Sequence, residues 1–594
     1  MWLIVLLGLL LLGEGLAQLL ILQQYPYASM IVWLLGYVIT ITWLIFGLFF
    51  FRQVPWVHRT SQYIGITASM YLIGMICYSL GYTTCALGIA GVWAMAMTFW
   101  LGLGLIRFIL YGASPVVGIA RILIDEAIRM RIIIVLFVAL LLVLVWMPLG
   151  MDPAEKLQYR IQSFLSWSLI VSSILLSIMT LLLSAWTITN EIEHRQIFLT
   201  LTKPVSRAQY LFGKFLGIII LNGLLLGVMG GGIYSFTMML AIQPAMNEQD
   251  RKAVDHEVLV ARKTALPQPS DQAQFQKQFE QQLDQLRREN PTYWGQPDEP
   301  ASALAPMMQA AIYQRVKIDW FKMPPNHWQS FQFTNLQALK KTGQHIQLRL
   351  KPELIQESSD GFVYLEMRIN DRPVPVPKLS DRTFHVLDIS PEFIDVNGDM
   401  KIQMGNLKEN QPTINFNTSD GLMVLYQVGR FEVNLAKALF ILWIRLCFLT
   451  MLGLAVGSFL GFPVACLACM TIYLISAFSG FIMEALAGYA YLPTQKYAGY
   501  ELAIWIIERI VQKFNEGKNW DIAKMLIRLF GHVILFFVPS LSDYDPTILI
   551  SEGIYLPFKY LLKAILWVGI IWTGMLALFS YLMFKGRELA RVVV

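Results

Sequence analysis

The sequence predicts an α-helical protein that crosses a membrane several times, with a mixed α and β domain inserted between its spans. The chain has 594 residues, of which 56% are apolar and only 14% are charged. Uncharged runs of about 20 residues, the length that a helix needs to cross the hydrocarbon core of a bilayer, recur along it. One long polar stretch between two such runs changes from helical periodicity to the alternation that is typical of strands.

We expect about ten membrane-spanning helices. They cover residues 1–22, 29–51, 62–81, 84–106, 132–149, 164–187, 209–242, 438–461, 464–487 and 559–584. The first run has no basic segment before it and leads directly into the second, which favours a membrane anchor over a cleaved signal peptide.

Basic residues predict the orientation of these helices, because Lys and Arg are enriched in short cytoplasmic loops. They collect in alternate loops and in the C-terminal tail: Arg52, Arg59, Arg107, Arg121, Arg129, Arg131, Arg195, Lys203, Arg207, Lys585, Arg587 and Arg591. The short loops 23–28, 82–83 and 150–163 hold only Lys156 and Arg160. We therefore expect both termini in the cytoplasm.

The first long segment on the outer side covers residues 243–437. Its first part places Phe275, Phe279, Leu283 and Leu286 on one helical face, and a second helical stretch lies near 301–318. From about 328 to 430, short alternating runs are separated by predicted turns such as Asn370-Asp371 and Asn397-Gly398, which predicts an antiparallel β-sandwich. The domain either binds an extracytoplasmic protein or ligand or forms a structural cap.

The second outer segment covers residues 488–558. It contains amphipathic stretches such as ELAIWIIERIVQKF. It also contains GHVILFFVP, which is too short to cross a bilayer and predicts a re-entrant or interfacial helix.

A polar segment, TNEIEHRQIFLTLTKPVSRAQYLFGKF, separates two apolar runs at residues 189–215. Asn190 and Glu193 have capping-box spacing, which predicts that a short helix begins there. Pro204 ends it, and Ser206 with Gln209 repeats the spacing at the start of the next span. This helix would lie across the cytoplasmic mouth of the bundle and transmit a push from a partner. An ordinary solvated loop helix is the alternative.

An amphipathic helix is expected just before the span at 132–149. Ser114 is suited to cap it, and Pro115 is suited to its first turn. Arg121, Asp125 and Arg129 recur on one face, which is typical of a helix on the inner membrane surface. A plain juxtamembrane connector is the alternative.

These features together resemble the permease subunits of ABC-2-type ATP-binding-cassette transporters. The amphipathic helix, the pattern E-I-E-x-R…L-x-x-K-P-V-S-R-x-x-Y-L-x-G-K between two spans, and a last span that ends in FKGRELARVVV carry the resemblance. It is strong over residues 113–242 and looser over 438–594. The most similar branch contains the permeases linked to maturation of multi-copper enzymes and to gliding motility.

The resemblance implies a six-span core within 132–584 that pairs with a second permease copy or homologue and docks on a dimer of cytoplasmic ATPase subunits. The segment after the second core span would be the coupling helix, held in a cleft of the ATPase. Its residues would be Asn190, Glu191, Glu193, His194, Arg195, Phe198, Lys203, Pro204, Ser206 and Arg207. The chain departs from the simplest members by a four-span extension at 1–112 and by the domain at 243–437, so the substrate stays open.

Small and acidic residues inside the spans are further candidates. Gly223 and Gly227, and likewise Gly453, Gly457 and Gly461, recur every four residues on a helix face, which allows close packing of membrane helices. A dimer interface or transport path is the less favoured use. Glu14 lies well within a span, where a carboxylate is costly, and is a candidate for an interhelical hydrogen bond; Glu484 is expected at the outer interface.

Several functions are not indicated. The G-x-x-x-x-G-K-[ST] phosphate-binding motif does not occur, so ATP hydrolysis is expected in a separate subunit, and we expect no catalytic residues. Cys466 and Cys469 form a C-x-x-C without further ligands nearby, so no metal or cofactor is expected. The dispersed basic residues carry no nucleic-acid motif.

We expect a permease subunit in a bacterial inner membrane that couples ATP hydrolysis by its partner to export or movement of an unknown substrate. An alternative is a protein that relays ATPase motion to an extracytoplasmic partner without transport. A polar path between the spans would favour transport, whereas a sealed bundle with a rigid stalk would favour the relay. An enzyme acting on lipid-linked substrates is least favoured, since no Asp, Glu, His or Ser constellation lies near either membrane face.

Overall fold

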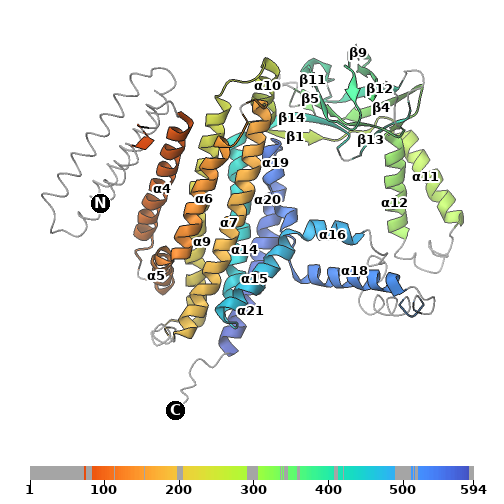
Figure 1. Ribbon diagram of the computed structural model, residues 1–594. Coiled ribbons are helices and arrows are strands. Elements are labelled where there is room, and N and C mark those ends of the chain that lie inside the picture. Colours follow the sequence, from red (N-terminus) through yellow and green to blue (C-terminus); the bar gives the residue numbers. More distant parts are fainter. Residues whose placement is uncertain are drawn as a thin grey trace.

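The computed structural model describes residues 83–112, 114–152, 154–194, 205–289, 305–334, 346–356, 361–395, 397–406, 412–418, 420–487 and 519–586, with a few single residues between these ranges. The expected spans at 1–22 and 29–51, nearly all of the one at 62–81, and Glu14 lie outside the described residues. The described chain is mostly helical and has a separate β-sheet region (Figure 1).

Within the described ranges, five helices are long and apolar enough to cross a membrane. They are α4 (Thr83–Ile109), α7 (Leu157–Glu193), α9 (Arg207–Ala241), α14 (Phe431–Gly457) and the C-terminal helix, which consists of α20 (Phe558–Ala564), the π-helical η5 (Ile565–Trp572) and α21 (Thr573–Gly586). A sixth candidate is α15 (Phe462–Ala477) followed by α16 (Ser479–Ala487), a pair bent by 61°. α6 (Arg131–Leu149) holds a shorter apolar stretch.

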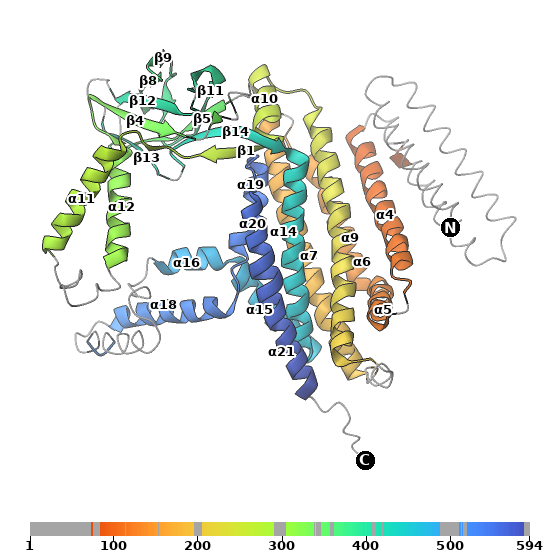
Figure 2. The same ribbon diagram turned by 180° about the vertical axis from the view of Figure 1, so that it is seen from behind.

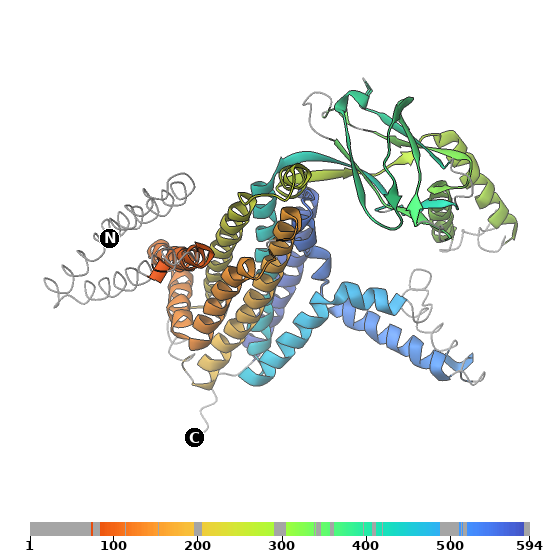
Figure 3. The same ribbon diagram turned by 45° about the horizontal axis from the view of Figure 1, so that its top comes forward.

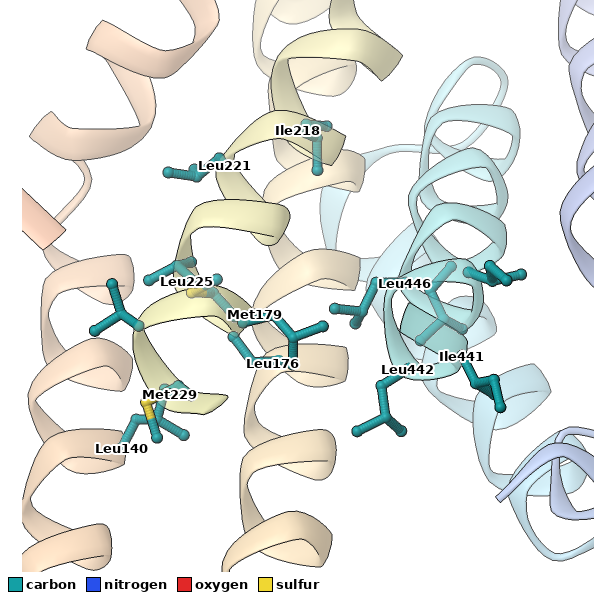
Figure 4. Packing of buried hydrophobic residues seen from close by; sticks show 14 of the residues in the cluster. Leu140, Leu176, Met179, Ile218, Leu221, Leu225, Met229, Ile441, Leu442 and Leu446 are labelled. Carbon is teal, nitrogen blue, oxygen red and sulfur yellow. The ribbon is translucent and has the colours of Figure 1, made fainter. Parts of the chain in front are cut away.

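The helices α7, α9 and α14 form the interior of the bundle, whereas α4 and the C-terminal helix are mostly exposed. Figure 4 shows Met179, Leu225 and Leu446 among the aliphatic side chains that fill the space between these three helices. A small polar group interrupts this interior: Thr180 Oγ1 lies 3.2 Å from Asn222 Oδ1, and Asn222 Nδ2 donates to Thr450 Oγ1 at 3.5 Å.

Two glycines bring α14 against α7. A Cβ on Gly453 would lie 1.8 Å from Ser184 Oγ, and one on Gly457 would lie 3.0 Å from the Ala185 carbonyl oxygen. At Gly223 a Cβ would lie 3.2 Å from Trp443 Nε1. Gly227 and Gly461 have no such neighbour within 4 Å in the described part of the chain, so the five predicted packing glycines are not equivalent there.

The β region contains two larger antiparallel sheets and two small ones. The first has the order β1 (Val260–Ala265), β14 (Leu422–Arg430), β5 (Ile346–Leu350) and β11 (His385–Ile389). The second has the order β2 (Gln268–Pro269), β4 (His327–Phe333), β12 (Met400–Asn406), β8 (Glu366–Ile369) and β9 (Arg372–Val374). The small sheets join β10 (Leu379–Ser380) to β7 (Phe362–Val363), and β3 (Lys322–Met323) through β13 (Ile414–Phe416) to β6 (Pro352–Leu354).

Sequence alternation and turn residues explain these strands. In β12, Met400, Ile402 and Met404 are fully buried against a core that is separate from the core of the bundle. The predicted turn at Asn370-Asp371 is confirmed, because both residues have positive φ angles, 46° and 65°, between β8 and β9. Asn and Asp tolerate this left-handed conformation better than most residues do.

Two helices accompany the strands of the β region: α11 (Gln272–Glu289) and α12 (Ala305–Trp320). The predicted apolar stripe of α11 is confirmed, because Phe275, Phe279 and Leu283 are buried. The rings of Phe275 and Phe279 meet Tyr313 of α12 edge to face, with centroids 5.4 and 5.9 Å apart. The two helices lie side by side in Figures 1 and 2.

Strand β14 continues directly into α14, with Arg430 as the residue before the helix. The segment that follows α19 (Thr547–Ser551) clamps this joint. Asn434 Nδ2 donates to the Ile554 carbonyl at 2.7 Å, and Asn434 Oδ1 accepts from the Leu556 N–H at 2.8 Å. The β region and the bundle therefore share an element without a linker.

Arg262 of β1 lies in the same joint. Its Nη1 donates to Gln347 Oε1 at 2.7 Å and its Nη2 to the Glu552 carbonyl at 2.9 Å. Burial lowers the pKa of the Arg262 guanidinium to about 10, and Glu257 opposes this shift. The arginine therefore stays charged at neutral pH while it ties both parts together.

The predicted interfacial segment forms the last part of α18 (Asn519–Phe537). This helix lies beside α16, and the pair projects sideways from the bundle (Figure 3). Most of ELAIWIIERIVQKF falls outside the described residues. Between α18 and α19 the chain makes the short 3-10 turn η4 (Ser542–Tyr544).

The α7–α14 contact generates one prediction. Gly453→Val should lower stability by about 1–3 kcal/mol, because the added side chain overlaps Ser184. The thermal midpoint of the purified protein in detergent measures the loss. Gly227→Val is the matched control, since no atom of the residues that the structure describes lies within 4 Å of its Cβ position. Equal midpoints for the two variants would contradict the contact.

Asp250 of α10 (Glu248–Ala253) caps the first turn of α7, since its carboxylate accepts from the Leu157 and Gln158 N–H groups at 2.9 and 3.0 Å. Burial raises the pKa of Asp250, but these backbone hydrogen bonds lower it by more. The net pKa of Asp250 is therefore below the usual value.

The Asp250 carboxylate therefore stabilises the folded protein above a pH of about 4. This stabilisation is lost as the pH falls through the pKa of Asp250 in the folded state. Asp250→Asn should destabilise the protein at pH 7 by about 1.5–3 kcal/mol. The gap between the thermal midpoints of the two proteins should narrow as the pH falls below about 4. A gap that does not change with pH would argue against the cap.

Candidate functional site

The candidate site lies at the end of the bundle away from the β region, where α5 (Pro115–Arg129), the last turn of α7, the first turns of α9 and the end of α21 meet (Figures 1 and 2). We call this arrangement the charged junction; it consists of Glu126, Thr187, Glu191, Tyr210 and Lys214.

The predicted amphipathic helix is α5, and it begins as expected with Ser114 at the N-cap and Pro115 in the first turn. The Ser114 side chain makes no capping hydrogen bond, so the extended backbone of Ser114 and the fixed φ of Pro115 set the start. The buried face of α5 consists of Ile119, Ala120, Leu123, Ile124 and Ala127.

Two glycines of α9 let α5 approach closely. A Cβ on Gly213 would lie 2.9 Å from Ile119 Cβ, and one on Gly217 would lie 2.9 Å from the Ala120 carbonyl oxygen. These glycines are four residues apart on one face of α9, the spacing that brings two helix backbones together. The contact places Glu126 of α5 over the beginning of α9.

Lys214 occupies the centre of the charged junction. Its side chain is only 2% exposed, and its ammonium group contacts the Glu191 carboxylate in a short hydrogen bond. The same ammonium donates to Thr187 Oγ1 at 3.1 Å and lies 3.8 Å from Glu126 Oε2. The Tyr210 hydroxyl donates to the other oxygen of Glu191 at 2.5 Å. One cation thus connects α5, α7 and α9.

The charges in the junction do not balance, since two carboxylates share one ammonium group. Burial raises the pKa of Glu126, Lys214 lowers it, and Glu191 adds to the rise, so the net pKa is above the usual value. Glu126 is also the more exposed of the two carboxylates, at 27%. It is therefore the group at which the junction can take up a proton or meet another positive charge.

The predicted capping box at the start of α9 is confirmed. Ser206 Oγ accepts from the Gln209 N–H at 3.2 Å, and the Ser206 N–H donates to Gln209 Oε1 at 2.9 Å. Arg207 then reaches the end of α21, where its Nη1 donates to the carbonyls of Phe584 and Lys585 at 2.9 and 2.8 Å.

These two carbonyls belong to the last turn of a helix, where carbonyl groups lack partners within the helix and favour a positive charge. Tyr210 stacks on Phe584 of the same turn, with ring centroids 5.7 Å apart. The C-terminal helix is thereby joined to the charged junction through α9.

The predicted helix start at Asn190 is wrong. Helix α7 continues without a break from Leu157 to Glu193, and the Asn190 carbonyl accepts from the His194 N–H at 3.0 Å inside its last turn. Capping-box spacing is also the spacing of one helical turn, and the preceding Thr187 and Ile188 stay helical, so Asn190 has no free amide to cap. Glu191 consequently points into the junction rather than toward a partner.

The other predicted coupling residues are spread over a wider region. Glu193 and His194 are exposed at the end of α7, and Ser206 and Arg207 begin α9. Arg195, Phe198, Lys203 and Pro204 lie outside the described residues.

On α5, Arg121 lies over the Tyr111 ring at 5.4 Å, and Asp125 pairs with Arg107 of α4 at 2.7 Å. Arg129 is exposed. The predicted polar face of α5 therefore meets α4 and the loop before α5 as well as solvent.

Sequence analysis gave Glu126 no role, and it placed Tyr210 and Lys214 only in the pattern that carries the resemblance to ABC-2 permeases. The sequence did hold a signal for a buried polar site. Tyr210 and Lys214 are four residues apart and share a face of α9. A lysine inside an apolar run is costly unless it is paired. The sequence could not say which carboxylates pair with Lys214, since they come from two other helices.

Among the described residues no group of three or more His, Cys, Asp or Glu side chains is placed to hold a metal ion. Comparison of the chain with protein-family models, with curated proteins and with solved structures gave no match. The junction therefore has to be interpreted from its own chemistry.

The junction generates a prediction about stability. Among the described residues, Lys214 supplies the ammonium group that the buried Glu191 and the partly buried Glu126 share, so Lys214→Met should cost about 3–5 kcal/mol. The control is Lys252→Met, because Lys252 pairs with Glu248 at 3.1 Å on the surface and its loss should cost less than about 1 kcal/mol. Thermal midpoints in detergent compare the two variants.

The double variant Lys214→Met, Glu191→Leu should recover part of the loss, because one uncompensated charge is removed as well. If the double variant is as unstable as the sum of both single variants, Lys214 and Glu191 do not act as a pair.

Proposed function

We propose that the chain is the transmembrane permease subunit of an ABC-2-type ATP-binding-cassette transporter, which couples ATP hydrolysis by a separate cytoplasmic ATPase to export or movement of a substrate. The observation that carries the proposal is the charged junction. It joins α5, α7 and α9 at the point where the chain leaves α7 and returns in α9, and Arg207 of α9 ties α21 to these helices. A partner that engages residues 190–207 would act on four helices at once.

The geometry also supports a route by which a displacement at the charged junction could reach the β region. Helices α7 and α9 have 37 and 35 residues, so each extends for roughly 50 Å as one rigid element. α14 contacts α7 through Gly453 and Gly457. The other end of α14 follows directly on β14. A displacement at the junction would reach the β region through packed, regular elements rather than through loops.

The proposal includes the partners that the sequence resemblance implies. They are a dimer of cytoplasmic ATPase subunits, a second permease copy or homologue, and the lipids of a bacterial inner membrane, with both termini in the cytoplasm. It also includes ten spans with a six-span core and a β-sandwich on the outer side.

A second candidate function is a relay that moves the β region without transport. Two observations favour it: aliphatic side chains fill most of the interior between the described helices α7, α9 and α14, where the contact of Thr180, Asn222 and Thr450 is a local polar interruption, and β14 enters α14 without a linker. These are the features expected of a sealed bundle with a rigid stalk.

Copurification tests the class. Glu193→Lys reverses an exposed charge at the end of α7 and should reduce the amount of copurified ATPase and its stimulation at least about tenfold, the effect of losing one charged contact of about 1.4 kcal/mol. The matched control is Glu248→Lys, an exposed glutamate at the start of α10, at the other end of the bundle (Figure 1). Unchanged binding and unchanged stimulation for Glu193→Lys would contradict the proposal.

Hydrogen exchange separates transport from relay. Under the relay, addition of ATP to the assembled complex should change the exchange rates in β5 and β14. A Gly-Ser insertion after Gly429 should abolish that change while the ATPase still binds. Transport alone predicts changes confined to the bundle.

A further inference from the structure

A second buried charge lies in the bundle, far from the charged junction. Arg445 is near the middle of α14, a candidate membrane span, and its side chain is only 8% exposed. Placing a charged side chain within a span is costly, so such residues usually serve a site, and they are normally paired. The sequence signal is plain in retrospect, since WIRLCF places one arginine within an apolar run.

The pairing of Arg445 is incomplete. Its Nη1 lies 3.6 Å from Asp545 Oδ2, too far for a good hydrogen bond, and this Nη1 has no hydrogen-bond partner among the described residues. Asp545 is engaged elsewhere, because its Oδ1 accepts from the Thr547 N–H at 3.0 Å and from Thr547 Oγ1 at 2.6 Å. A buried guanidinium donor is thus left for another acceptor.

The chain around Asp545 is held in place by the bend of the broken span. Ser479 Oγ lies 2.8 Å from Ser540 Oγ and 2.9 Å from Ser542 Oγ, and the Leu541 N–H donates to the Ser476 carbonyl at 3.0 Å. These contacts fix the return from α18 against the α15–α16 bend. Asp545 therefore cannot easily move closer to Arg445, and the loose pairing belongs to the fold.

The surroundings of Asp545 include tyrosine and lysine side chains. Tyr544 and Tyr560 lie together, with ring centroids 6.0 Å apart, and Lys563 Nζ is 6.0 Å from the centre of the Tyr544 ring. Side chains of these two kinds are enriched where a membrane meets water, at the level of lipid headgroups. The adjoining α16 and α18 expose apolar side chains that suit the acyl region: Phe481, Met483, Leu526, Ile527, Phe530 and Val533.

We propose that Arg445 anchors a binding site for the phosphate headgroup of an anionic phospholipid, in the corner formed by α14, the α15–α16 bend and the segment 540–547. The planar guanidinium offers several donors that fit phosphate oxygens in a forked arrangement, which a single distant carboxylate oxygen does not satisfy. Asp545 competes with the phosphate for this group. The inference does not depend on coupling to an ATPase.

Lipid binding to the full-length protein tests the site, with phosphatidylglycerol as the probe, phosphatidylcholine as its zwitterionic counterpart, and glycerol 3-phosphate as the free headgroup. Native mass spectrometry of the detergent-solubilised protein measures the affinity for each. Arg445→Gln should weaken phosphatidylglycerol binding about tenfold or more, the expected effect of losing a charged hydrogen bond. Asp545→Asn should strengthen it, because the competing carboxylate is gone.

The control is Arg107→Gln, which removes a half-exposed arginine of α4 that pairs with Asp125. It should leave the lipid preference unchanged. Binding of glycerol 3-phosphate as tight as that of the lipid would show that the site takes a free phosphate, and would overturn the lipid assignment.

A structural role alone predicts the opposite pattern for Asp545. If Arg445 and Asp545 only fasten the fold, Asp545→Asn should lower the thermal midpoint and leave the preference for phosphatidylglycerol over phosphatidylcholine unchanged, which would overturn the proposal. Should Arg445→Gln fail to fold, Arg445→Lys keeps the charge without the fork and should bind phosphatidylglycerol more weakly than the wild-type protein. Equal binding would also overturn it.

Discussion

The arrangement of the bundle depends on the buried contact between Lys214 and Glu191. An ammonium group that is almost fully buried has to be paired, because burial without a partner is far more costly than any packing gain at one residue. This requirement fixes the rotation of α9 relative to α7, and it draws Glu126, and with it α5, onto the same side. Once α9 is fixed, the contacts of Arg207 and Tyr210 with Phe584 set the position of the last turn of α21. The contact therefore orders helices that are far apart in the sequence.

Much of the architecture was predictable from local patterns. The apolar runs at 209–242, 438–461 and 559–584 overlap α9, α14 and the C-terminal helix, and the periodicity of Phe275, Phe279 and Leu283 identified the buried face of α11. The turn at Asn370-Asp371 and the capping box at Ser206 were also predictable. Each of these features depends on residues within one or two turns of each other, so the sequence contains the whole of the physical cause.

The site was harder to predict because its partners come from distant parts of the chain. The spacing of Asn190 and Glu193 fits both a helix start and a helix interior, and only the continuation of α7 decides between them. Glu191 was noted for charge at the surface, but it turns inward because Lys214 lies across from it. The lone arginine in WIRLCF signals a buried charge, but its partner Asp545 lies far along the chain and could not be identified from the sequence. Long-range pairing of this kind has no local signature.

The π-helical segment η5 has a consequence for the length of the C-terminal helix. In this segment each N–H bonds to the fifth preceding carbonyl instead of the fourth, and Thr573 Oγ1 also donates to the Val568 carbonyl at 2.9 Å. Loss of a single residue here can be absorbed by return to ordinary α-helical winding, which leaves Phe584 in phase with Arg207. The same loss in α21 would turn Phe584 away from it. The π-helical segment can therefore lose one residue while the contacts of Phe584 with Arg207 and Tyr210 are kept.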